Sequence, residues 1–271
     1  MKRTKSDYSI QTVTNALSLL EVFETEASIG VSELSRRLGL HKNNVFRLLA
    51  TLEERGFVEQ EPGGDRYRLS LRCFELGQAF VRSHGLLREA QPVLDALATE
   101  LGESAHLAVL SSFEVVHLAA GQPGQILLAG ARVGRRLPAH CTALGKALLA
   151  FAPEPLRQAY DVEIVAAAGL AARTARSITD REKLLEHLHA VASRGVAFDV
   201  EECERGVACA AAPVFDGTGR LLAAISVSGP SSRLGEDVLE AGVGPRVAAA
   251  AEALSARLGA RPALARGSLV T

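Results

Sequence analysis

The stretch 34–52 contains side chains whose chemistry suits nucleic acid. It has no acidic residue, and its polar positions include Arg37, Lys42, Asn43, Asn44 and Arg47. Asparagine and arginine can form paired hydrogen bonds with adenine and guanine edges, whereas cationic side chains neutralise phosphates. We therefore expect double-stranded DNA as a partner, with Asn43, Asn44 and Arg47 on base edges. Arg37 and Lys42 are expected on phosphates.

Three helix patterns position these side chains. Apolar residues recur every three or four positions over 31–38 and 45–52, and Gly39 between them supplies a left-handed helix end. Upstream, the same spacing predicts a helix from residue 10 with one apolar face formed by Val13, Ala16, Leu17, Leu20 and Phe23. A short helix, a glycine turn and a basic helix are typical of a helix-turn-helix that enters the major groove.

A hairpin pattern follows the third helix. Residues 57–60 and 66–69 have strand character on either side of the turn Glu61–Asp65. Three helices and a hairpin predict a winged helix-turn-helix domain over 1–70. Arg66 and Arg68 lie where the wing would meet phosphates.

Helical spacing then predicts a linker helix over 71–85 and another helix over 86–101. The apolar stripe of the second fits either an intramolecular core or a dimer seam. Strand patterns dominate the rest of the chain, at 104–110, 115–120, 125–129, 196–200, 206–215 and 221–228. Helix patterns cover 143–150, a segment with Thr179 as N-cap and Glu182 completing a capping box, and 234–258. This order predicts an α+β domain with an antiparallel sheet over 86–260, and a disordered tail over 261–271.

Composition and cysteine spacing narrow the class of protein. A net charge of −1 excludes a protein that is basic overall, but a local basic face is enough for DNA. The chain has no apolar run of membrane-spanning length and no signal-type start, so we expect a cytoplasmic protein without a membrane partner. The four cysteines are scattered without metal-ligand spacing, which predicts free thiols, no metal and no cofactor.

Two catalytic motifs that the sequence suggests at residues 140–147 are incomplete. A phosphate loop ending at Gly145 and Lys146 would need glycine and serine or threonine where the chain has His140 and Ala147. Cys141 and adjacent His140 would point apart on regular structure and lack an orienting group. His106 and His117 alternate with apolar residues, which indicates structural or cavity-lining roles rather than metal binding. We therefore predict that the chain is not an enzyme.

Four blocks of the chain resemble the IclR-type family of bacterial transcriptional regulators: 33–52, 137–150, 195–209, and 211–215 with 224–230. The resemblance implies a winged helix-turn-helix joined by a linker helix to a GAF-like effector domain. It also implies a homodimer or homotetramer, and a small effector, commonly an organic acid. One departure is Asn43-Asn44, where the family usually carries Ser-Thr, so the operator sequence cannot be transferred from relatives.

The resemblance also places an effector site in the second half. It implies that a carboxylate binds the backbone amides of Ala143 and Leu144, at a helix start where N–H groups lack partners. The remaining family positions fall on Asp199, Cys209, Ser226 and Ser228. The two serines lie two residues apart on a strand and therefore share a face.

The leading interpretation is an effector-responsive regulator of a catabolic or metabolic operon. An α+β enzyme with an accessory winged helix is the alternative, and a winged-helix interaction module without a ligand is a third. Whether the effector releases DNA or tightens binding is left open by the sequence.

Overall fold

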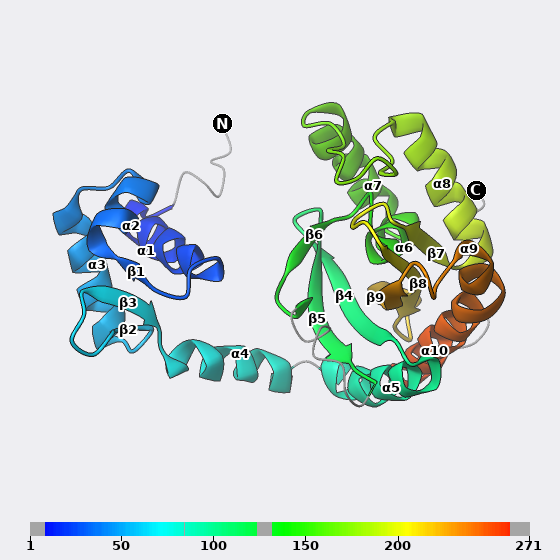
Figure 1. Ribbon diagram of the computed structural model, residues 1–271, viewed down its shortest axis with the longest axis horizontal. Coiled ribbons are helices and arrows are strands. Elements are labelled where there is room, and N and C mark those ends of the chain that lie inside the picture. Colours follow the sequence, from blue (N-terminus) through cyan, green and yellow to red (C-terminus); the bar gives the residue numbers. More distant parts are fainter. Residues whose placement is uncertain (1–8, 84, 124–131, 261–271) are drawn as a thin grey trace. The chain divides into compact units, whose positions relative to one another are not determined.

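The computed structural model describes residues 9–83, 85–123 and 132–260 (Figure 1). The chain divides into two units, Met1–Ser83 and His84–Thr271. The first combines helices with a small sheet, and the second is a larger sheet covered by helices, which confirms the predicted α+β class. The predicted strand at 125–129 and the predicted tail lie outside the described residues.

The first unit contains the expected helix-turn-helix. Its first four helical elements are α1 Gln11–Glu21, the short 3-10 helix η2 Val22–Glu24, α2 Val31–Leu38 and α3 Lys42–Glu54. α2 ends at Gly39, which has a φ of 64° and so takes the left-handed conformation that glycine permits. Leu19, Leu34 and Leu49 are fully buried and join the three main helices in one core.

The wing is a three-stranded sheet rather than the predicted two-stranded hairpin. Strands β2 Val58–Gln60 and β3 Arg66–Leu69 pair as predicted. The two-residue strand β1 Ile29–Gly30, which the sequence analysis missed, pairs with the other side of β3. Through this pairing, the wing is hydrogen-bonded to the segment that immediately precedes α2. The helix α4 Leu71–Ser83 then follows as predicted.

The apolar face predicted for the first helix is only partly buried. Val13 and Leu17, which belong to that face, are 52% and 55% exposed. Phe23 of the predicted face is buried, and Ala16 and Leu20 are partly buried, together with Leu19, which was not part of the predicted face. The apolar face of α1 is wider than the surface that its own unit covers.

The second unit is built on an antiparallel sheet of six strands among the described residues. They are β4 Ser104–Ser111, β5 Glu114–Gly121, β6 Arg136–Pro138, β7 Ala197–Val200, β8 Val207–Phe215 and β9 Leu221–Pro230. Their order is β6-β5-β4-β9-β8-β7, so β7 lies at an edge, as its sequence pattern indicated. The short strand β6 was not predicted.

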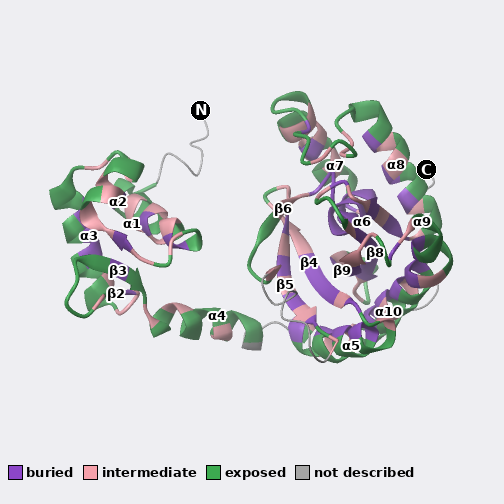
Figure 2. Ribbon diagram, in the orientation of Figure 1, coloured by how far each residue is buried: buried purple, intermediate pink, exposed green. Residues whose placement is uncertain are grey.

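Helices cover both faces of this sheet (Figure 1). One face packs on α5 Gly85–Leu101 and α10 Gly244–Arg257, and the other on α6 Ala143–Ala150 and α8 Arg181–Arg194. The apolar stripe of α5 is buried in this intramolecular core, which is the first of the two roles that its sequence pattern allowed (Figure 2). α6 begins and ends at the predicted residues and is buried along its whole length.

Two helical segments differ from the prediction in detail. The segment 234–258, predicted as one long helix, contains α9 Glu236–Val238, the π-helix η5 Leu239–Val243 and α10. The sequence analysis did not predict α7 Glu154–Tyr160 or the π-helix η4 Asp161–Ala166 that follows it. The N-cap of α8 is Asp180, which accepts from the Lys183 amide at 2.9 Å, so the capping box at Thr179 was wrong by one residue. None of the helices in the described part of the chain combines the length and apolar character that a membrane span requires.

Candidate functional site

The outer face of α3 presents the polar residues singled out in the sequence. Lys42, Asn43, Asn44 and Arg47 are exposed, while Val45, Leu48 and Leu49 are buried beneath them. Within the described residues, these four exposed side chains have no hydrogen bond or ion pair. Their polar groups are therefore available to bases and phosphates.

The other three predicted DNA contacts already have intramolecular partners. Arg37 pairs with Glu26 at 2.6 Å and with Glu33 at 3.1 Å, and Arg68 pairs with Glu59 at 2.7 Å. Arg66 donates from Nε to the Ser28 hydroxyl at 3.0 Å. Exposed ion pairs of this kind are worth about 0–1 kcal/mol, so a phosphate can displace the carboxylates of Glu26 and Glu59. The roles of these arginines at DNA stay predictions.

An apolar residue joins the polar face of α3. Phe46 is 57% exposed although its neighbours Val45 and Leu48 are buried. An exposed aromatic ring on a recognition helix can contact a thymine methyl group in the major groove. The sequence signal was its position, between Val45 and Arg47 and off the buried stripe. We did not include it among the predicted contacts.

All six predicted effector residues line one small cavity between the N-terminal end of α6 and the sheet, here named the α6 cavity. Ala143 and Leu144 come from α6, Asp199 from β7, Cys209 from β8, and Ser226 and Ser228 from β9. The structure thus brings together residues that are separated by as many as 85 positions in the chain.

The N-terminus of α6 supplies anion-binding groups. The Thr142 hydroxyl caps the helix by accepting from the Gly145 amide at 3.1 Å, and it donates to the Pro138 carbonyl at 2.9 Å. The amides of Ala143 and Leu144 precede any intrahelical acceptor, so they are left for an external one. The helix dipole adds partial positive charge at this end. A carboxylate is the natural ligand of this arrangement.

The sheet presents a polar row to the cavity. Asp199 lies opposite Cys209, and Cys209 lies opposite Ser228, so three neighbouring strands carry these side chains in direct register. Asp199 accepts from the Glu202 amide at 2.7 Å. Burial raises the pKa of Asp199 to about 7, although Lys146 and backbone donors act in the opposite direction. The carboxyl is therefore partly protonated near neutral pH and can donate as well as accept.

Two buried histidines complete the cavity wall. His106 and His117 are 1% and 2% exposed, and their rings meet edge to face with centroids 5.3 Å apart. His106 Nε2 lies 3.1 Å from the Ser228 hydroxyl. Burial lowers the pKa of His106 to about 3 and that of His117 to about 4, so both rings are neutral at physiological pH. Their alternation with apolar strand residues had indicated a structural or cavity-lining role.

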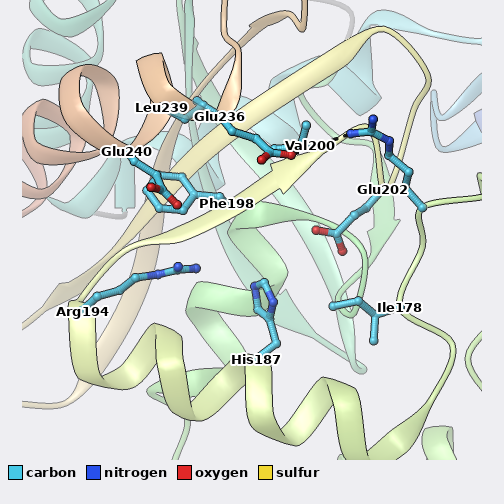
Figure 3. Close-up of a pocket in the computed structure, with 10 residues that line it drawn as sticks. Ile178, His187, Arg194, Phe198, Val200, Glu202, Glu236, Leu239 and Glu240 are labelled. Carbon is cyan, nitrogen blue, oxygen red and sulfur yellow. Dashed lines mark ion pairs between the residues drawn. The ribbon is translucent and has the colours of Figure 1, made fainter.

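A second hollow, the β7 groove, runs along the edge strand and has a volume of about 370 Å³ (Figure 3). His187 and Arg194 of α8 face Leu239 and Glu240 across it. Although the groove is larger, its arginines are engaged: Arg194 donates to the Val196 carbonyl at 2.6 Å and stacks on Phe198. None of its lining residues was among the predicted site residues.

Lys146 is close to residues that line the two hollows. It is fully buried and forms an ion pair with Glu202, whose side chain lines the β7 groove. The Glu202 backbone amide also holds Asp199 on the α6 cavity side. Lys146 therefore serves as a buried structural cation rather than as part of a phosphate loop.

Two family models match the chain, and together they span most of it. The IclR helix-turn-helix domain matches residues 12–62, and the bacterial transcriptional regulator IclR C-terminal domain matches residues 78–256. The chain belongs to the IclR family. It is therefore a DNA-binding transcriptional regulator with an effector-binding C-terminal domain, and not an enzyme.

Relatives of this IclR-family chain match it over nearly its full length. It is 34% identical to the HTH-type transcriptional regulator XynR of Escherichia coli over 92% of the chain and 98% of that protein. The crystal structure of the Thermotoga maritima IclR superposes with a TM-score of 0.72 at 28% identity, covering 93% and 100% of the two chains. An IclR homologue from Microbacterium hydrocarbonoxydans, complexed with 4-hydroxybenzoate, shares the fold with a TM-score of 0.75 at 24% identity, covering 91% and 99%.

Proposed function

We propose that this regulator controls a catabolic or metabolic operon in the cytoplasm and senses a small organic acid in the α6 cavity. The observation that carries the proposal is the convergence of the Ala143 and Leu144 amides with Asp199, Cys209, Ser226 and Ser228 around one cavity. An unpartnered helix N-terminus favours a carboxylate, and the hydroxyls opposite it favour a ligand with further polar groups. The carboxylate in the related protein bound to 4-hydroxybenzoate is consistent with this class.

We further propose that the protein acts as a homodimer, or as a tetramer built from such dimers. Two helices of the first unit carry exposed apolar side chains: Val13 and Leu17 on α1, and Leu71, Phe74, Leu76 and Val81 on α4. Exposed apolar side chains in such number are typical of an association surface. Paired protomers would present two copies of α3 to an operator with two-fold symmetry.

The DNA side of the proposal is tested by replacing Arg47 with alanine. We expect the variant to bind its operator about 1–3 kcal/mol more weakly if Arg47 reads a base, since its side chain is exposed on α3 and has no partner among the described residues. The operator is recovered by selecting bound duplexes from a random pool with the wild-type protein. Affinity is then measured by fluorescence anisotropy at fixed salt.

Arg88→Ala is the matched control, since Arg88 is an exposed cation on α5 of the second unit. We expect this control to bind the operator as the wild type does. If Arg47→Ala and Arg88→Ala bind equally well, Arg47 does not read a base. If the wild type enriches no duplex, the proposed DNA interface is wrong.

A further inference from the structure

The lining of the α6 cavity includes buried polar atoms for which the described part of the chain supplies no hydrogen-bond partner. Within the described residues, His117 has no hydrogen bond at Nδ1 or Nε2, and His106 has none at Nδ1. Both histidines line the cavity together with Ala143 and Leu144. Buried polar atoms are almost always paired in folded proteins, because each unpaired group costs roughly 1–3 kcal/mol. Unpaired nitrogens in a cavity wall are therefore groups that a ligand can satisfy.

The charge of this wall selects the kind of ligand group. His106 and His117 are neutral at physiological pH, since burial is the main cause of their lowered pKa values. A neutral imidazole offers one donor and one acceptor. Arg132 also lines the cavity, but it is paired with Glu204 at 3.0 Å. The wall therefore matches an uncharged hydroxyl, which donates and accepts, or a carbonyl, which accepts.

We propose that His106 and His117 bind a neutral hydroxyl or carbonyl group of the effector while the α6 N-terminus binds its carboxylate. This rests on the proposed function and specifies its ligand as an organic acid with a polar, uncharged group at its far end. A purely apolar acid would leave the imidazole nitrogens unpaired. A diacid would bring a second anion to a neutral wall next to Asp199, where its charge is poorly compensated.

The proposal is tested with matched acids that differ only at the far end: para-hydroxybenzoate, benzoate and terephthalate, and beta-hydroxypropionate, propionate and malonate. Each is titrated into the full chain by calorimetry. We expect the hydroxylated acid of at least one series to bind about tenfold or more tightly than both of its partners. The replacements His117→Phe and His106→Phe keep a ring in place but remove its nitrogens. Each should reduce this preference while the apolar acid still binds.

His189→Phe is the control, because His189 is an exposed histidine on α8. It should keep the wild-type preference. The inference is overturned if the wild type binds the hydroxylated and apolar acids equally, or if a folded His117→Phe or His106→Phe keeps the full preference. If no acid of either series binds the wild type at millimolar concentration, the proposed acid site fails, and this inference fails with it.

Discussion

Replacing Lys146 with methionine is expected to lower the free energy of unfolding of the second unit by about 3 kcal/mol. Lys146 is fully buried, and its ammonium group pairs with the carboxylate of Glu202. Removal of the lysine would leave the Glu202 side chain, which is only 11% exposed, without its counter-charge. Burial already raises the pKa of Glu202, so the carboxyl would partly protonate, which keeps the loss at the lower end of the usual range.

Urea denaturation of the full chain measures this effect, and two further variants make it specific. The double variant Lys146→Met/Glu202→Leu removes both charges and should recover most of the lost stability, because an apolar pair of similar volume replaces the ion pair. Lys183→Met changes an exposed lysine on α8 and should stay within about 0.5 kcal/mol of the wild type. A double variant as unstable as Lys146→Met alone would contradict the ion-pair explanation.

Replacing Gly145 with alanine is expected to cost about 3 kcal/mol or more, or to prevent folding. A Cβ at this position would lie 2.2 Å from the Ala139 carbonyl oxygen and 2.3 Å from the Ala139 Cα. These are backbone atoms, which cannot move aside as a side chain can. Only glycine therefore lets the first turn of α6 approach residues 138–139, and this approach directs the Ala143 and Leu144 amides toward the cavity.

Gly242→Ala is the matched control for Gly145→Ala. Gly242 lies in η5 of the same unit, and a Cβ there would make only an ordinary contact of 3.7 Å with Arg246. Because alanine favours helical backbone over glycine, we expect this variant to be as stable as the wild type or up to about 1 kcal/mol more stable. Thermal unfolding followed by circular dichroism compares the variants. A Gly145→Ala protein that melts with the wild type would show that α6 does not approach the 138–139 backbone so closely.

Elements with strong local signals could be predicted from the sequence. α2 has a glycine end at Gly39, and α6 begins after Thr142, so their limits follow from capping chemistry. Elements defined by distant contacts were missed. β1 and β6 have two and three residues, too few for a periodic pattern, and they exist because β3 and β5 pair with them. The N-cap of α8 was misplaced because Thr179 and Asp180 both have a capping oxygen.

In the candidate sites, too, features set by local sequence could be predicted, and features set by distant contacts could not. The exposed polar face of α3 follows from helical period alone, because Val45, Leu48 and Leu49 fix which side is buried. The pairing of Arg37 with Glu26 and that of Arg66 with Ser28 could not be foreseen, since these partners lie 11 and 38 positions away. The family resemblance supplied the positions around Asp199 and Ser226, whereas the contact between His106 and His117 arises from the pairing of β4 with β5.

The measurement that tests the account most directly is the operator affinity of the full chain with and without an acid that binds the α6 cavity. Fluorescence anisotropy with the selected operator gives both values, for the wild type and for Ser226→Ala/Ser228→Ala. We expect the saturating acid to change the wild-type affinity by roughly 5–150-fold, the usual range of coupling between two sites. The double variant should need more acid to reach the same change. An operator affinity that stays constant while the acid saturates the wild-type cavity would contradict the account.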